Sequence, residues 1–197
     1  MIRTTLAFSL AFALAAVSHA ASISISSAPT VGLAGMTTYT LTGTAAAGEK
    51  VVGFVFVGGG GAYGITGPLN QVNPFSLPTV FNDNNTLFVP AGKDVSQDSQ
   101  FLVKSTDGIA ITPSESANSL KGAFAFLPAN LPAGNSLAFV QLVSDNPTAV
   151  HYNGTLTIRN QAGEDRLETF EGSLIPEPAT LGLLGLALVG FCGIRRR

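Results

Sequence analysis

The stretch Thr38-Tyr39-Thr40-Leu41-Thr42 alternates polar and apolar side chains, and Ser22-Ile23-Ser24-Ile25-Ser26 does the same. Because successive side chains of a strand point to opposite faces, each stretch predicts a strand with one buried face. The β-branched threonines favour strand geometry. Thr155-Leu156-Thr157-Ile158 repeats the pattern near the end of the chain. The sequence therefore predicts a domain built from strands.

Further apolar runs of strand length lie between these stretches. They cover residues 51–57, 87–89, 101–104, 123–127 and 137–143. Pro second and Gly fourth predict type I turns at residues 89–92 and 131–134, and Asn153-Gly154 predicts a β-hairpin turn. Apart from the two ends, the chain shows no helical stripe. We therefore predict an all-β fold, an antiparallel β-sandwich over residues 21–163.

Composition excludes several classes of protein. The chain has 197 residues, 46% hydrophobic and 11% charged, with a net charge of -2, a pI near 5.6 and a mean hydropathy of +0.37. Proteins that bind nucleic acid carry basic patches, so we expect no nucleic-acid partner. One cysteine allows no disulfide within the chain. Residues 21–175 hold six basic and eleven acidic side chains, so the centre is acidic and the ends are basic.

The first 20 residues have the parts of a secretory signal peptide. Arg3 supplies a positive charge, and a mostly apolar run over residues 6–17 follows it. Ser18 and Ala20 are small residues at the -3 and -1 positions before Ala21, which is the pattern that signal peptidase cleaves. We therefore predict an N-terminal signal helix that is removed after Ala20.

The C-terminal end predicts a membrane helix. Residues 179–194 are sixteen residues without a charge, and as a helix they span about 24 Å of a hydrocarbon core about 30 Å thick. Local thinning or snorkelling arginines can make up the difference. Arg195, Arg196 and Arg197 should stay in the cytoplasm as an anchor, because cationic flanks resist translocation. The domain would then lie outside the cytoplasm.

Two short segments connect the domain to this helix. Residues 164–175 gather charge and predict an edge strand and spacer. Pro176-Glu177-Pro178 then forms a stiff, non-helical strut, because proline fixes φ and restricts the residue before it. Together with the short apolar helix and the terminal arginines, this strut resembles the PEP-CTERM sorting signal over residues 176–197.

The resemblance implies how the chain is processed and where it goes. It implies recognition by an exosortase, a multi-spanning membrane cysteine enzyme, at Pro176, Glu177 and Pro178. It also implies a precursor in the inner membrane of a Gram-negative-type bacterium and a mature protein at the cell surface or in the extracellular matrix. Signal peptidase and the exosortase are then the enzymes that process the chain. The precursor is in contact with the inner membrane for a limited time, and exopolysaccharide is a candidate partner of the mature protein.

Motifs for cofactors and metals are weak. Residues 59–64 contain G-x-G-x-x-G, but the prolines that follow leave no helix to bind a dinucleotide phosphate. Residues 82–85 and the pair Asp94 and Asp98 offer oxygens for Ca²⁺, yet they do not match a calcium loop, and turn formation explains them. We expect no cofactor and no metal site.

Catalytic residues are scarce. Once the two ends are removed, His151 is the only histidine and Cys192 is lost with the tail. General acid–base and nucleophilic sites depend heavily on these residue types. We therefore expect no catalytic residue and no enzymatic activity. A secreted hydrolase is the third alternative, since a carboxylate pair needs no local motif.

Sugar-binding surfaces use Trp and Tyr, whose rings stack on sugars. The chain has no Trp and only Tyr39, Tyr63 and Tyr152. The leading hypothesis is an exported, non-catalytic cell-surface or matrix protein, associated with biofilm or exopolysaccharide. The alternative is a carbohydrate-binding module for exopolysaccharide.

Overall fold

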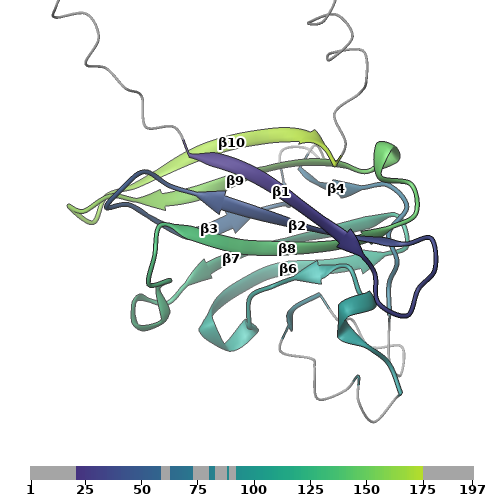
Figure 1. Cartoon of the computed structure of the whole chain (residues 1–197). Helices are drawn as coiled ribbons and strands as arrows, with labels where there is room; N and C mark the ends of the chain where they lie inside the picture. The colour runs from purple at the N-terminus through teal and green to yellow at the C-terminus, as the bar shows by residue number, and fades with distance from the viewer. Residues whose placement is uncertain (1–20, 59–62, 73–79, 83–87, 89–91, 175–197) are drawn as a thin grey trace, which may run out of the picture.

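The structure is a computed structural model that describes residues 21–58, 63–72, 80–82, 88 and 92–174. Over these residues the chain forms two antiparallel sheets packed face to face (Figure 1). The predicted signal helix (1–20) and membrane helix (179–194) lie outside the described residues. Within the described ranges, no helix has the length and apolar character needed to cross a membrane.

The smaller sheet has four strands in the order β1-β2-β8-β5. They are β1 (Ser22–Pro29), β2 (Thr37–Thr44), β8 (Ser136–Ser144) and β5 (Gln100–Phe101). In β1 the isoleucines are half-buried and the serines exposed, as the alternation predicts. β1 pairs with β2 without a break from Ser22↔Thr44 to Pro29↔Thr37.

The larger sheet has six strands, and two of them lie end to end between the same two neighbouring strands. They are β10 (Asp165–Ser173), β9 (His151–Arg159), β3 (Lys50–Val55), β4 (Gly64–Thr66), β7 (Ser119–Phe126) and β6 (Gly108–Ser116). Both β3 and β4 pair with β9 on one side and with β7 on the other. They therefore lie end to end between β9 and β7, and β10 and β6 are the edges of this sheet.

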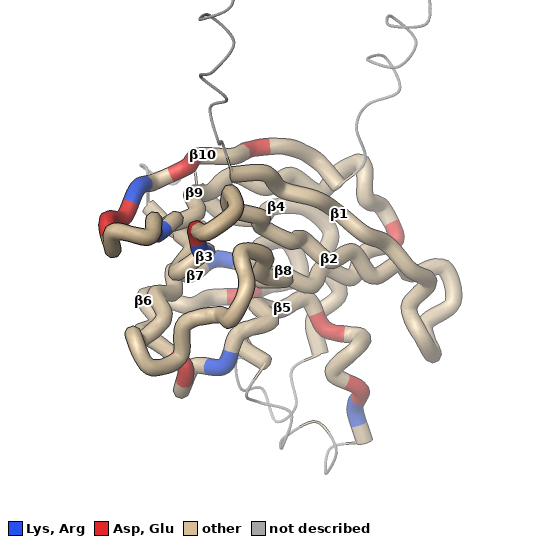
Figure 2. Tube along the Cα trace, turned by 60° about the vertical axis from the view of Figure 1, so that its left-hand side comes forward, with Lys and Arg blue, Asp and Glu red and all other residues tan. Residues whose placement is uncertain are grey.

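Short 3-10 helices connect several strands. They are η4 (Val95–Gln97), η5 (Ser105–Asp107), η6 (Pro128–Asn130) and η7 (Pro147–Ala149). Pro128 and Pro147 stand near the starts of η6 and η7, where the missing proline N–H costs no hydrogen bond. Figure 2 shows that the charged residues gather around the β9–β10 turn and the lower loops, while β1 and β2 show none.

Phenylalanine side chains fill the space between the two sheets. Phe54 of β3 is fully buried, and its ring centroid lies 4.9 Å from that of Phe101 and 5.6 Å from that of Phe139. Phe101 and Phe139 belong to the opposite sheet. Such pairs stabilise a core by about 0.5–1.5 kcal/mol each beyond the area that they bury. The aromatic cluster therefore joins the two layers.

The predicted hairpin turn at Asn153-Gly154 is wrong, because both residues lie inside β9. A Cβ atom on Gly154 would come within 2.7 Å of the Val55 carbonyl oxygen and 3.1 Å of the Phe56 ring. Glycine in a strand often marks such a close approach. Here the glycine lets β9 pack against β3 and Phe56.

Candidate functional site

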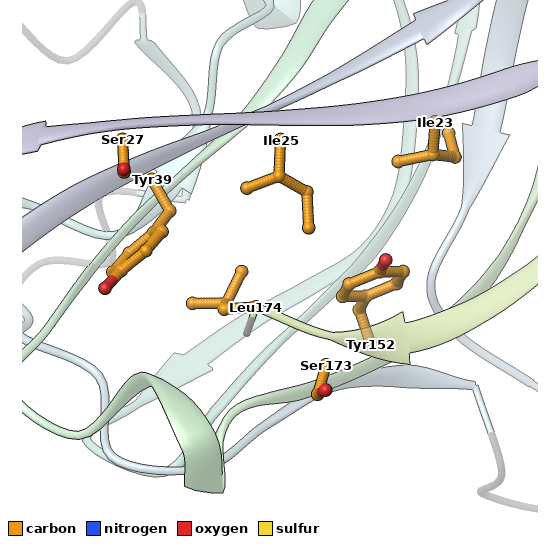
Figure 3. Close-up of a pocket in the computed structure, with 7 residues that line it drawn as sticks. All are labelled: Ile23, Ile25, Ser27, Tyr39, Tyr152, Ser173 and Leu174. Atoms are coloured by element: carbon orange, nitrogen blue, oxygen red, sulfur yellow. The ribbon is translucent and has the colours of Figure 1, made fainter. Parts of the chain in front are cut away.

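An open cleft lies between the edges of the two sheets, where β1 passes over the end of β10 (Figure 3). Its volume is about 440 Å³. The lining consists of aliphatic, tyrosine and serine side chains: Ile23, Ile25, Ser27, Tyr39, Tyr152, Ser173 and Leu174. The cleft brings together the first and the last strands of the sandwich.

Strand alternation places the lining side chains. Ile23 and Ile25 point from β1 toward the cleft, as Figure 3 shows. Tyr39 of β2 lies beside β1, where it pairs with Ser27 in the ladder. Tyr152 comes from β9 in the other sheet. One wall of the cleft therefore belongs to the smaller sheet and the other to the larger sheet.

Leu174 closes the floor of this cleft and ends the described chain. Its side chain is 4% exposed and belongs to the hydrophobic core. Its backbone N–H donates to the Val150 carbonyl oxygen at 3.2 Å. The core of the sandwich thus includes Leu174, the residue after β10.

The cleft is uncharged and combines aliphatic side chains with hydroxyl groups. Its lining, as far as the structure describes it, has no charged side chain. Burial raises the pKa of the Tyr152 phenol above its ordinary value, so this group stays protonated and can donate a hydrogen bond at neutral pH. Tyr39 is only 6% exposed and packs into the core. The cleft can therefore bury an apolar group beside one phenol.

The structure separates the residues considered for calcium. Asp94 caps η4, where its carboxylate accepts from the Ser96 N–H at 2.9 Å and this contact lowers the pKa of Asp94. Asp98 is fully buried and accepts from the Val72 N–H at 2.7 Å. Over the described residues, no group of three or more His, Cys, Asp or Glu side chains is placed to hold a metal. Residues 83–85 lie outside the description.

The remaining candidates also lie apart from the cleft. The strand β4 begins at Gly64, the last residue of the glycine-rich segment 59–64, so no helix follows this segment to bind a phosphate. His151 is exposed at the start of β9, opposite Ser173 and Thr66 in the ladders. Tyr63 does not line the cleft that holds the other two tyrosines.

Ion pairs join β10 to the rest of the larger sheet. The guanidinium of Arg166 donates to both oxygens of Glu49, and its Nε donates to Glu168 at 3.0 Å. Arg159 and Asp165 form a second pair, with Nε and Oδ1 2.7 Å apart. The hydrogen bond to Arg159 lowers the pKa of Asp165 below its ordinary value.

The described residues form a β-sandwich whose last described strand, β10, ends at Ser173. Residues 174–197 match the family model of the PEP-CTERM protein-sorting motif, which confirms the resemblance drawn from the sequence. This motif implies an exported protein that an exosortase processes at the membrane. Comparison with curated proteins and with solved structures found no match for the chain.

The family match begins at the residue that closes the cleft. The sorting residues Pro176, Glu177 and Pro178 and the three terminal arginines fall within the match and outside the described residues. Ser18 and Ala20 of the predicted signal-peptidase site also lie outside, whereas Ala21 is half-buried against the core. Along the chain, both predicted processing sites therefore lie within a few residues of β1 and β10.

The sequence did not predict that Leu174 is buried or that Tyr39 and Tyr152 line the same cleft. Leu174 falls in a segment that reads as charged, yet it continues the inward alternation of Phe170 and Gly172 on β10. That period of two could have identified it. That Tyr39 and Tyr152 line one cleft depends on the way the two sheets stack, which no local pattern reveals.

Proposed function

We propose that this protein is an exported, non-catalytic component of the cell surface or extracellular matrix. It is made as an inner-membrane precursor, and an exosortase then removes or exchanges its C-terminal tail. The sorting motif supports export and exosortase processing, and we propose in addition a biofilm or exopolysaccharide context.

The observation that carries this proposal is the position of Leu174. The last described strand, β10, ends at Ser173, and Leu174 packs into the core and donates its N–H to the Val150 carbonyl oxygen. The sorting motif begins at the same residue. Cleavage near Pro176–Pro178 would therefore remove the tail and leave the packing of the sandwich intact.

The distribution of polar groups supports a non-catalytic role. His151 is exposed and pairs across the ladders with Ser173 and Thr66, which are not acid–base partners. Asp94 and Asp98 hold backbone N–H groups, and Arg166 and Glu49 hold two parts of the larger sheet together. These charges serve the structure of the domain, which is what a stable surface protein requires.

The test is to replace the sorting residues in the natural host. Pro176→Ala, Glu177→Ala and Pro178→Ala together should leave a precursor in the inner membrane that keeps the mass of its tail. Pro128→Ala with Glu164→Ala is the matched control, because it removes the same residue types at exposed positions of the domain. The control should be processed like the parent. Normal mass and location of the triple variant would refute the sorting role.

A carbohydrate-binding module is the second candidate, and the cleft is the observation in its favour. Tyr152 is half-buried there beside Ser173, as Figure 3 shows. Because Tyr39 packs into the core, one ring remains to contact a sugar, which is fewer than stacking platforms use. A glycan array should give binding that Tyr152→Ala abolishes and Tyr63→Ala leaves unchanged. No binding by the parent would remove this candidate.

A further inference from the structure

The smaller sheet carries no charge at all. None of its four strands β1, β2, β8 and β5 contains Lys, Arg, Asp or Glu, and residues 21–48 form an unbroken uncharged stretch. In Figure 2 the tube of β1 and β2 is free of blue and red along its length. Its outer face presents serines from β1 beside threonines from β2, for example Ser24 opposite Thr42.

Edge strands are sites where a second chain can pair, because one row of backbone N–H and C=O groups has no partner. Three of the four edges here are blocked. At β5 the Phe101 N–H donates to the Val80 carbonyl oxygen at 2.7 Å, so residues 80–82 cover that edge. β6 is interrupted by a bulge at Thr112, which has a φ of 43°, and by Pro113. β10 carries Asp165, Arg166, Glu168 and Glu171.

β1 has none of these protections over most of its length. It is eight residues long, it has no charge and no bulge, and its single proline is the last residue, Pro29. Among the described strands, β2 is its one ladder partner. A long, regular and uncharged edge of this kind favours pairing with another strand.

We propose that β1 pairs antiparallel with β1 of a second copy of this chain, with Ser24 opposite Ser24 at the two-fold axis. In this register Ile23 lies opposite Ile25, and Ser22 lies opposite Ser26. Serines then stay on the outer face and isoleucines on the cleft face of both copies, since paired residues of an antiparallel ladder share a face.

The alternation of β1 explains why the partner is a second copy. A strand that pairs here must place polar residues opposite the serines and apolar residues opposite the isoleucines. The segment Ser22–Ser26 reads the same in both directions, so an antiparallel second copy meets this requirement. The absence of charge removes repulsion between two identical edges. The two smaller sheets would join into one continuous eight-stranded sheet. This inference concerns the folded domain and does not depend on how the tail is processed.

A cross-linking experiment tests the register directly. The exported protein is purified from its host in a Cys192→Ser background, so that each variant holds one cysteine. Ser24→Cys should form a covalent dimer under mild oxidation, because facing residues of an antiparallel pair lie within disulfide reach. Ser26→Cys is the matched control on the same exposed face; it would face Ser22 and should stay monomeric.

A charge placed at the same position tests the association without a covalent bond. In sedimentation velocity the parent should show twice the monomer mass at high protein concentration. Ser24→Lys sets two like charges opposite each other and should raise the dissociation constant by at least about tenfold. Thr169→Lys, at an exposed site on the edge strand β10, should leave it unchanged. A monomeric parent, equal effects of both lysines, or equal cross-linking at residues 24 and 26 would each overturn the proposal.

Discussion

Gly154 illustrates how a single residue is fixed by packing between strands. An added Cβ would meet the backbone oxygen of Val55 at 2.7 Å, and a backbone atom cannot rotate away as a side chain can. We expect Gly154→Ala to lower the free energy of unfolding by about 1–3 kcal/mol, the usual cost of overpacking. Urea denaturation of residues 21–174 measures it.

Gly134→Ala is the matched control for this substitution. The nearest atom to an added Cβ at Gly134 is the Ser136 nitrogen at 3.9 Å, which is ordinary contact. This variant should unfold within about 0.5 kcal/mol of the parent. Equal effects of the two alanines would show that the close approach of β9 and β3 does not determine the need for glycine.

Gly154 also shows why the sequence predicted a turn at the wrong position. Asn-Gly is the strongest short signal for a hairpin turn, and the residues on both sides alternate as strands do. The turn between β9 and β10 instead lies at residues 160–164, where the Asn160 N–H donates to the Glu164 carbonyl oxygen at 3.0 Å. Local chemistry permitted both places, and at Gly154 the chain instead continues as a strand so close to Val55 and Phe56 that no Cβ would fit.

At the level of elements, strongly alternating strands could be predicted and weakly patterned ones could not. β1, β2, β7 and β8 appear where alternation or apolar runs placed them. β6 was missed because Thr112 and Pro113 interrupt it with a bulge. β4 is three residues long and depends on β7 and β9 for its pairing, so its own sequence carries almost no signal.

The ion pair between Arg159 and Asp165, next to the turn between β9 and β10, should make the stability of the domain depend on pH. The hydrogen bond from Arg159 depresses the pKa of Asp165 in the folded state. The ionised carboxylate therefore stabilises the fold above its unfolded pKa, near pH 4, and this contribution is lost as the pH falls through the folded pKa. As the pH falls from about 5 to about 2, Asp165→Asn should lose less stability than the parent.

Thermal unfolding over this pH range is the measurement, and Asp145→Asn is the control. Asp145 is exposed in the connection between β8 and β9, so its substitution should leave the acid dependence of the parent in place. Identical pH curves for Asp165→Asn and the parent would mean that the ion pair with Arg159 does not contribute in solution, as is common for exposed pairs.

At the scale of the whole molecule, Leu174 should fasten the end of β10 to the core. Leu174→Ala removes a side chain that is 4% exposed and should cost at least about 2 kcal/mol in the unfolding of residues 21–174. Leu167→Ala is the matched control on the same strand, because that leucine is 69% exposed. Equal effects of the two substitutions would show that the cleft does not hold the end of the chain.

The sorting tail could be predicted from the sequence, whereas the cleft could not. The sorting tail was recognisable from Pro176, Glu177 and Pro178 and the terminal arginines, since a linear signal is read as a sequence, and the family match confirms it. The cleft was not predictable, because its walls come from β1 and β9, which are far apart along the chain. Only the stacking of the two sheets brings them together.

Intact-mass spectrometry of the exported protein tests the central claim most directly. The protein is purified from its host and from the same host lacking its exosortase. We predict that the first sample starts at Ala21 and lacks residues 179–197, and that the second keeps the tail through Arg197. A protein from the normal host that still ends at Arg197 would contradict the claim that this β-sandwich is delivered through a removable sorting signal.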